Sequence, residues 1–224
     1  MLLDISKSYD FFQPEKITER IHIIGCGSVG STVAENLVRC GLTKLTLWDM
    51  DKVEPHNVAN QMFTQKDVGK LKVDALKDIL LAINPTLPEL ITEPNGWQGK
   101  KLSGYLFLCV DSIELRRQIV ENHMKTPFVK AVFDFRTGLE TAQHYAADWS
   151  DDKLKENLLK SMSFSDDEAN QQTPVSACGT TLGVATTVRV ISAIGVNNFI
   201  NFTKGNGVKK FILIDSFQPY IEAF

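Results

Sequence analysis

Cysteine is scarce in this sequence, and no two of its four cysteines stand in a C-x-x-C spacing. Zinc sites that stabilise small domains usually take their ligands from such closely spaced pairs. We therefore expect no structural zinc. Three cysteines lie in or beside apolar segments, where a thiol commonly packs as a small hydrophobic group; these are Cys26, Cys40 and Cys109.

An excess of positive charge is also missing. The chain has 24 Lys and Arg against 27 Asp and Glu, a formal net charge of −3, whereas nucleic-acid-binding domains usually present a basic surface. We expect no nucleic-acid partner. The balance of 43% hydrophobic and 23% charged residues is that of an ordinary globular protein. At 224 residues the chain can bury a core without disulfides or metals.

Neither a leader nor a membrane span is evident. The first twelve residues include Asp4 and lack the apolar run of a secretory signal. The most apolar stretch, 180–200, carries Arg189 near its middle, and a central arginine costs roughly 2.5–3.5 kcal/mol on insertion scales. We therefore expect a buried helix in a soluble, cytoplasmic domain with no membrane partner.

Apolar runs alternate with helical patterns over the first 134 residues. This rhythm predicts an α/β fold: a doubly wound, Rossmann-like, mostly parallel sheet with helices on both faces. Antiparallel strands and a long apolar helix are expected toward the C-terminus. The expected strands are 21–24, 44–48, 90–92, 105–110, 128–133, 141–147 and 211–215, and the expected helices are 31–40, 67–83, 113–124 and 180–201.

No internal repeat or Pro/Gly/Ser-rich linker divides the chain, so we expect a single nucleotide-binding domain over 1–224. The stretch 150–173 is polar and acidic. A solvated surface helix and loop is one interpretation of it. The other is a flexible crossover segment, 148–177, that lies across a substrate tail.

A glycine turn joins the first strand to the first helix, in the sequence Gly25-Cys-Gly27-Ser28-Val-Gly30. Gly25 permits the tight turn, Gly27 lets a phosphate approach the backbone, and Gly30 lets the helix pack against the strand. The start of the following helix offers free N–H groups and a dipole that attract a phosphate, and we include Ser28 in the nucleotide site. Dehydrogenases and flavoproteins share this pattern.

Asp49 ends the second strand. A carboxylate at this position can accept hydrogen bonds from both ribose hydroxyls. The turn and Asp49 together predict an adenosine with a free ribose, and they do not distinguish NAD from ATP. An NAD-dependent oxidoreductase therefore stays open at this point.

The next segments are more specific. The chain reads WDMDKVEPHNVANQMF over 48–63 and DVGKLK over 67–72. This sequence resembles the ThiF/MoeB/HesA family, which shows D-x-D-x-V-x-x-x-N-L-x-R-Q and then D-x-G-x-x-K. Members of the family adenylate ubiquitin-like proteins and sulfur carriers. The resemblance extends from about residue 21 to 134, and more loosely to the C-terminus.

The resemblance implies roles for the polar residues around the phosphate loop. Asp49 and Asp51 match two carboxylates of the family, which lie on the ribose side and the metal side of the nucleotide site. Asn57 and Gln61 match polar residues of the phosphate loop. Asn60 lies in the same loop, where the family commonly has arginine, and we include it in the nucleotide site.

Two further residues carry the chemistry that the resemblance implies. Lys72 matches the family's phosphate-binding lysine. Asp111, in the segment CVDSIELR that ends at Arg116, matches the aspartate that holds Mg²⁺ and is needed for adenylation. Transfer at a phosphate requires a compact cation and a carboxylate that binds magnesium, because negative charge accumulates on the phosphate oxygens.

Two cationic contacts of the family are missing. Besides the Asn60 replacement, the N-terminal region 9–12 lacks the arginine that the family often contributes across a dimer. Arg136, in the segment DFRTGLE over 134–140, is a candidate replacement and resembles a bacterial and phage subgroup of ThiF-like proteins. It would face the phosphates or the partner's tail, or form an ion pair with Asp134 or Glu140. Lys70 is a second candidate.

Cys178 lies near the start of the long apolar helix, where the helix dipole lowers the pKa of a thiol. Its position loosely resembles the reactive cysteine of some ThiF-like and ubiquitin-like-activating enzymes. A buried cysteine that packs the helix on the sheet is the alternative.

The resemblance implies an adenylyltransferase that uses ATP and Mg²⁺ to activate a carboxylate, the C-terminal glycine of a ubiquitin-fold or sulfur-carrier protein. A peptide terminus or a tRNA-linked carboxylate stays open as the substrate. Because the family is usually dimeric, we expect a homodimer. The rival hypotheses are a degenerate scaffold that binds nucleotide or partner without turnover, and the oxidoreductase.

Overall fold

One mixed sheet organises the molecule, in a computed structural model that describes residues 3–172 and 182–224. The strand order is β3-β2-β1-β4-β5-β6-β7-β8. The first five strands in the chain pair in parallel and the last three pair antiparallel, as expected. They are β1 (Ile21–Ile24), β2 (Leu45–Trp48), β3 (Ile91–Glu93), β4 (Gly104–Leu108), β5 (Val129–Thr137), β6 (Thr141–Asp148), β7 (Phe211–Asp215) and β8 (Tyr220–Ala223).

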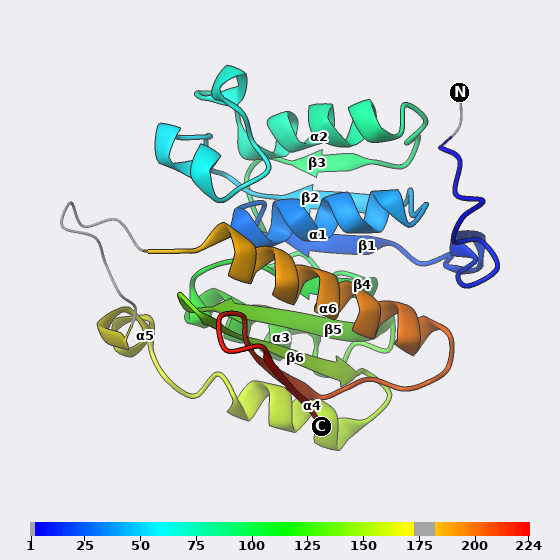
Figure 1. The fold of residues 1–224 in the computed structure, drawn as a ribbon. Helices are drawn as coiled ribbons and strands as arrows, with labels where there is room; N and C mark the ends of the chain where they lie inside the picture. Colours follow the sequence, from blue (N-terminus) through cyan, green and yellow to red (C-terminus); the bar gives the residue numbers. More distant parts are fainter. Residues whose placement is uncertain (1–2, 173–181) are drawn as a thin grey trace.

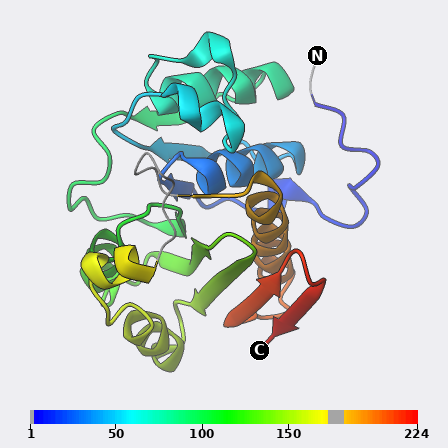
Figure 2. The ribbon, with the colours of Figure 1, turned by 60° about the vertical axis from the view of Figure 1, so that its left-hand side comes forward.

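Helices cover both faces of the sheet (Figure 1). On one face lie α1 (Ser28–Arg39), α2 (Lys72–Ile83) and α6 (Ala185–Thr203), and on the other lie α3 (Ile113–His123) and α4 (Asp152–Lys160). The short α5 (Asp166–Gln172) lies beside α3 (Figure 2). The described residues also form three 3₁₀ helices: η1 (Pro14–Lys16), η2 (Pro55–Ala59) and η3 (Gln65–Asp67).

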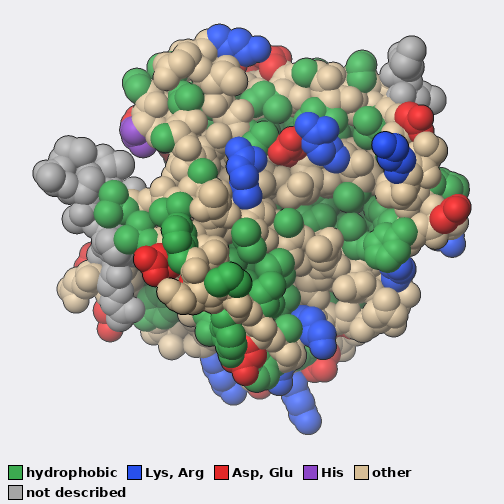
Figure 3. Space-filling view, in the orientation of Figure 1, with side chains coloured by type: hydrophobic (Ala, Val, Ile, Leu, Met, Phe, Trp, Pro, Cys, Tyr) green, Lys and Arg blue, Asp and Glu red, His purple; other side chains and the backbone are tan. Residues whose placement is uncertain are grey.

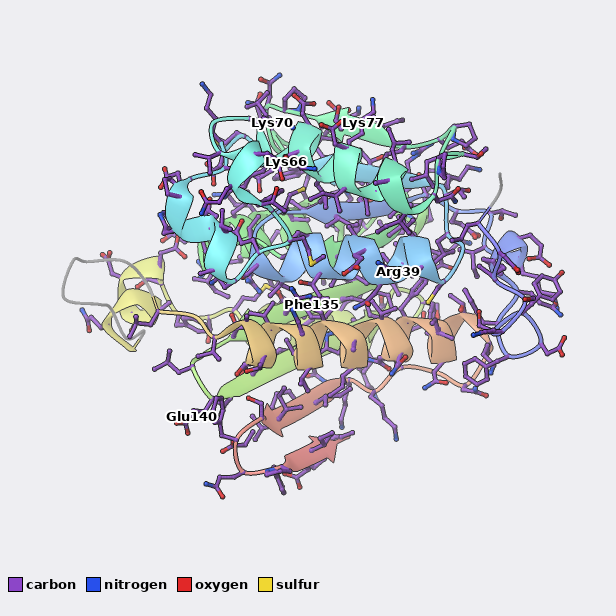
Figure 4. All side chains as sticks on the ribbon, turned by 45° about the horizontal axis from the view of Figure 1, so that its top comes forward. Arg39, Lys66, Lys70, Lys77, Phe135 and Glu140 are labelled. Carbon is purple, nitrogen blue, oxygen red and sulfur yellow. The ribbon has the colours of Figure 1, made fainter. Side chains whose placement is uncertain are left out.

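The central strands β1, β2 and β4 are buried along their whole length. Because helices cover both faces, these strands are continuous apolar runs instead of alternating ones. Phe107, Phe133 and Phe199 pack as an aromatic cluster under α6. Gly195 lets α6 approach the sheet, since a Cβ there would lie 2.1 Å from the Phe135 ring, which points toward α6 in Figure 4.

The helix expected over 67–83 begins later, at Lys72. Gly69 has a φ of +90°, a left-handed conformation that ends the helical path. Before it, the Asp67 carboxylate accepts hydrogen bonds from the N–H and hydroxyl of Thr64, which closes η3 as a separate turn. This shift places Lys72 in the first turn of α2.

The acidic stretch after β6 is more closely packed than a solvated surface segment. It forms α4 and α5, and Leu158 and Met162 are 3% and 0% exposed. Amphipathic spacing explains the difference, because the few apolar residues share one face of α4. Cys178 and the end of the expected crossover segment lie outside the described residues.

The β7–β8 hairpin forms one edge of the sheet. Strand β8 was not predicted from the sequence, because its residues are all exposed and their hydrophobicity alternates weakly. Exposed apolar side chains gather over the β7–β8 hairpin (Figure 3), among them Phe217 and Ile221. Within the described ranges, no helix is both long enough and apolar enough to cross a membrane.

Candidate active site

The glycine turn between β1 and α1 is a tightly packed backbone junction. Gly25 has a φ of +92°, and a Cβ there would lie 2.7 Å from the backbone of Cys109 and Val110. A Cβ on Gly30 would lie 1.8 Å from the Gly25 carbonyl oxygen. Both positions therefore require glycine. Gly27 precedes α1, whose N-terminus has no side-chain cap in the described part of the chain, so its first N–H groups are available to a ligand.

A cavity of about 270 Å³ opens above this turn, at the carboxyl ends of β1, β2 and β4. Parallel strands end at one edge of the sheet, so residues that follow different strands meet there. The cavity brings together seven of the residues that the sequence singled out: Gly25, Gly27, Asp49, Asp51, Gln61, Lys72 and Asp111. Ser28 is the first residue of α1, next to this lining.

Asp49 is held by the backbone. Its Oδ2 accepts a hydrogen bond from the N–H of Cys26 at 2.6 Å, and its Oδ1 accepts one from the N–H of Asp51 at 2.9 Å. Burial raises the pKa of the Asp49 carboxyl, and these hydrogen bonds oppose the rise. Since each carboxylate oxygen has two lone pairs, Asp49 retains acceptor capacity toward the cavity.

Lys72 is a buried cation at the wall of the cavity. Its Nζ donates to Asp51 Oδ2 at 2.7 Å, and its side chain is 11% exposed against 63% for Asp51. Burial lowers the pKa of the Lys72 ammonium, but the hydrogen bond to Asp51 and the charges of Asp49, Asp51 and Asp111 outweigh burial and raise it. Lys72 is therefore charged at neutral pH.

Asp111 follows β4 and is exposed. Its Oδ1 accepts a hydrogen bond from the N–H of Ser112 at 2.9 Å, and Ser112 is the N-cap of α3. Among the described residues no group of three or more His, Cys, Asp or Glu forms a complete metal cage. Mg²⁺ usually takes one or two protein carboxylates together with substrate phosphates, so the donor set at this edge suits Mg²⁺ bound to a nucleotide.

Gln61 has an unsatisfied group. Its Oε1 is buried and has no hydrogen-bond partner within residues 3–172 and 182–224. A buried polar atom without a partner costs about 1–3 kcal/mol. Its Nε2 lies 3.9 Å from where a Cβ on Gly27 would be, so the Gln61 amide is next to the glycine turn. Its missing partner has to be an N–H or O–H donor, since phosphate oxygens only accept hydrogen bonds.

Two predicted residues of the phosphate loop have other neighbours. Asn57 is 6% exposed, and its Oδ1 accepts the Glu54 N–H at 2.9 Å, which caps η2. The Nδ2 of Asn60 lies 3.0 Å from where a Cβ on Gly183 would be. In the described structure neither residue lines the cavity.

Lys70 is also occupied elsewhere. It pairs with Asp67 and Asp78 at 3.1 and 3.2 Å. It lies on the outer side of the loop before α2, close to Lys66 (Figure 4). The second sequence candidate for the missing phosphate cation therefore does not line the cavity above the glycine turn.

Arg136 lines a second cavity, of about 440 Å³, which also includes Asp111. Its Nε donates to Asp134 Oδ2 at 2.8 Å, and its two terminal nitrogens donate to the carbonyl and hydroxyl oxygens of Ser161 at 2.8 Å. The ion pair expected with Asp134 is present, whereas Glu140 lies in the turn between β5 and β6 (Figure 4) and forms no ion pair with Arg136 in the described structure. Arg136 does not reach the first cavity.

Asp134 connects the two arginines of this region. It is 0% exposed, and Arg116 donates to its second oxygen and to the carbonyl oxygens of Val110 and Phe135. The Arg116 guanidinium therefore joins the ends of β4 and β5 directly below Asp111. This buried contact gives Arg116 a structural role.

Sequence reasoning missed the apolar side of the first cavity. Met50 and Trp97 line it together with Gly96. The Trp97 indole N–H donates to the Lys100 carbonyl oxygen at 2.7 Å, which orients the ring. The turn residues Asn95 and Gly96 after β3 were the available signal, because ligand-binding loops follow the carboxyl ends of parallel strands.

Two known relatives of this chain carry the same name. The chain is 44% identical over 72 residues to ubiquitin-like modifier-activating enzyme 5 of Caenorhabditis elegans, covering 32% of this chain and 17% of that protein. For the Bombyx mori enzyme of the same name the identity is 46% over 122 residues, covering 47% and 31%. The chain thus spans less than a third of these two relatives.

Solved structures share the fold over nearly the whole chain. E. coli MccB with ATP superimposes with a TM-score of 0.73 at 18% identity, covering 94% of this chain and 65% of MccB. PaaA gives a TM-score of 0.68 at 19% identity, covering 99% and 68%. The model of the ThiF family matches residues 13–220. With this match across most of its length, the chain belongs to the ThiF family.

Proposed function

We propose that this protein is an adenylyltransferase that uses ATP and Mg²⁺ to activate a carboxylate. The observation that carries the proposal is the convergence of Lys72, Asp49, Asp51 and Asp111 on one cavity above an open glycine turn. Membership of the ThiF family supports it, as do relatives named as activating enzymes of ubiquitin-like modifiers. MccB, of similar fold, has been crystallised with ATP and with MccA.

Each part of the nucleotide would have a counterpart in the first cavity. The backbone at Gly25 and Gly27 and the start of α1 would bind phosphate. Asp49 would accept the ribose hydroxyls, and Trp97 and Met50 would cover the base. Lys72 would neutralise phosphate charge, and the unpartnered oxygen of Gln61 would accept a hydrogen bond from an O–H or N–H of the nucleoside.

The reaction would be displacement at the α-phosphorus. A carboxylate oxygen of the substrate forms a bond to this phosphorus, the bond to the bridging oxygen breaks, and pyrophosphate leaves with the electron pair. Mg²⁺, held by Asp111, would neutralise charge on the phosphate oxygens. Lys72 would stabilise the same charge from the opposite wall, at a site that excludes part of the solvent.

We assign the substrate's tail to the second cavity. Asp111 borders both cavities, so a tail there would end beside the nucleotide. The substrate class we propose is the C-terminal glycine of a ubiquitin-fold or sulfur-carrier protein. Arg136 would contact this tail, because its guanidinium belongs to the second cavity and the first holds Lys72 as its cation.

The decisive experiment is ATP–pyrophosphate exchange. The purified chain is incubated with Mg²⁺, ATP, labelled pyrophosphate and small ubiquitin-fold proteins that end in glycine. Exchange that depends on the carboxylate partner supports the proposal. The missing family arginines favour one rival, a binding scaffold, which predicts ATP binding without exchange for every partner tested.

Further predictions accompany this function. Cys178 would act after adenylation, so Cys178→Ser should leave pyrophosphate exchange intact and abolish only a later transfer.

We also propose a homodimer, to be measured by light scattering. A cytoplasmic location, where ATP is available, can be tested by cell fractionation.

A further inference from the structure

Asp166, the first residue of α5, lies on the N-terminus of α3, although 54 residues separate it from Ser112. Its Oδ2 accepts a hydrogen bond from the Ser112 hydroxyl at 2.7 Å. Its Oδ1 accepts hydrogen bonds from the N–H groups of Ile113 and Glu114, at 2.5 and 3.3 Å. Figure 2 shows α5 beside the start of α3. One carboxylate thus contacts three consecutive residues.

These contacts complete the capping of α3. The first N–H groups of a helix have no partner within the helix and attract negative charge. Ser112 caps one of them by accepting the N–H of Leu115 at 3.0 Å, and Asp166 accepts two others. Burial raises the pKa of Asp166, but the hydrogen bonds from Ser112, Glu114 and Ile113 outweigh burial and lower it. Asp166 is therefore ionised where it lies.

Asp111 is part of the same small network. Its Oδ1 accepts the N–H of Ser112, whose hydroxyl donates to Asp166. The orientation of Ser112 is therefore set from both sides, and Asp111 lies between the two cavities that it borders. Movement of the first turn of α3 would move Asp111 with it.

A second contact holds the chain that delivers Asp166. Arg117, on α3, donates from its Nε to the Met162 carbonyl oxygen at 2.9 Å and from a terminal nitrogen to the Phe164 carbonyl oxygen. The connection between α4 and α5 is thus attached to α3 just before Asp166. The other acidic residues of the turn behave differently, because Glu168 caps α5 through Ser165 and Asp167 is exposed.

We infer that Asp166 is a positioning residue for Asp111. Its carboxylate locks the first turn of α3, and this holds Asp111 ready for Mg²⁺ bound to the nucleotide. The inference rests on the proposed function, since it assumes that Asp111 meets Mg²⁺. It adds a residue from a separate helix to the site. A cap that only stabilises α3 would have no effect on magnesium binding.

The test compares Asp166→Ala and Asp166→Asn with the control Asp167→Asn. Calorimetric titration measures Kd for ATP with and without Mg²⁺, and hydrogen exchange measures protection of the Ile113 and Glu114 amides. We expect Asp166→Ala to weaken Mg²⁺-ATP binding about tenfold, to change metal-free ATP binding less than twofold, and to speed exchange at both amides. Asp166→Asn should recover most of the affinity, because its amide oxygen still accepts from Ile113.

Two results would overturn the inference. Unchanged Mg²⁺-ATP affinity in Asp166→Ala would mean that Asp166 only stabilises α3 and does not position Asp111. Equal losses in Asp166→Asn and Asp166→Ala would assign the effect to charge instead of position. Failure of the proposed function looks different, since the wild-type chain would then bind no Mg²⁺-ATP. Hydrogen exchange then tests the inference separately. Unchanged exchange of the Ile113 and Glu114 amides in Asp166→Ala would show that Asp166 does not hold the first turn of α3.

Discussion

The ammonium of Lys72 lies 2.7 Å from the Asp51 carboxylate, so a nearly buried cation is paired with a largely exposed anion. Because Asp51 is exposed and Lys72 is held at the wall of the cavity, we propose that an incoming phosphate replaces Asp51 as the partner of Lys72. Until then the pair would keep the charge of the lysine neutralised.

Lys72→Ala should lower the rate of pyrophosphate exchange by at least about a hundredfold, because one transition-state contact is commonly worth this much. Lys77→Ala, on the same helix, is the matched control and should retain full exchange. Full activity of Lys72→Ala would mean that Lys72 takes no part in the reaction.

Asp111→Asn should reduce exchange by a similar factor of about a hundred, because a neutral amide binds Mg²⁺ weakly. Raising the Mg²⁺ concentration should restore part of the rate. Asp152→Asn is the control, since Asp152 is 88% exposed on α4. A loss of activity that does not respond to Mg²⁺ would contradict the metal role.

Substitution of two glycines of the turn should affect two different properties, stability for Gly30 and ATP binding for Gly27. Gly30→Ala places a Cβ 1.8 Å from the Gly25 carbonyl oxygen, so we expect a loss of roughly 1–3 kcal/mol in the free energy of unfolding. Gly27→Ala has its nearest neighbour at 3.9 Å, so the fold should keep its stability while ATP binding weakens at least tenfold. Urea unfolding and calorimetry separate the two, and equal behaviour of the variants would refute this assignment.

Arg136→Ala should raise KM for the carboxylate partner several-fold more than KM for ATP. The reason is that the guanidinium lies in the second cavity, held by Asp134 and Ser161. Steady-state kinetics, with each substrate varied in turn, measures the two KM values separately. A rise confined to KM for ATP would instead mean that Arg136 reaches the triphosphate, in place of the missing family arginines.

Stability should fall between pH 6.5 and 4 because of three buried histidines. Burial lowers the pKa of His22 and His144 to about 4 and also lowers that of His123. The unfolded chain therefore takes up protons near pH 6.5 that the folded chain takes up only at lower pH. The stabilisation is complete above pH 6.5 and is lost as the pH falls, by roughly 2 kcal/mol at pH 5 for each of His22 and His144.

Urea unfolding at pH 7 and pH 5 measures this loss. His144→Gln should show a loss smaller by roughly 2 kcal/mol, and it should fold because Asn198 and the Asp134 carbonyl can still bond to an amide at this position. His56→Gln is the control, as His56 is half exposed. The capping carboxylates Asp67 and Asp166 have lowered pKa values, so their contributions are lost only below about pH 4 and do not interfere. Equal stability at the two pH values would refute the prediction.

Much of the nucleotide cavity could be predicted from local sequence alone. Gly25 and Gly30 specify a turn whose geometry excludes a side chain, and apolar runs that alternate with helical patterns specify a parallel sheet. Because parallel strands end at one edge, Asp49 after β2 and Asp111 after β4 had to be neighbours. Residues adjacent in sequence to strand ends are placed by the topology itself.

Tertiary structure decided what depends on contacts between distant segments. Arg136 was open to several partners, and only the packing of α4 beside β6 brought Ser161 to its guanidinium. Asp166 reached α3 because the Met162 and Phe164 carbonyls are fastened by Arg117. Such contacts depend on the summed packing of whole elements, and no local pattern encodes which long side chain meets which carbonyl.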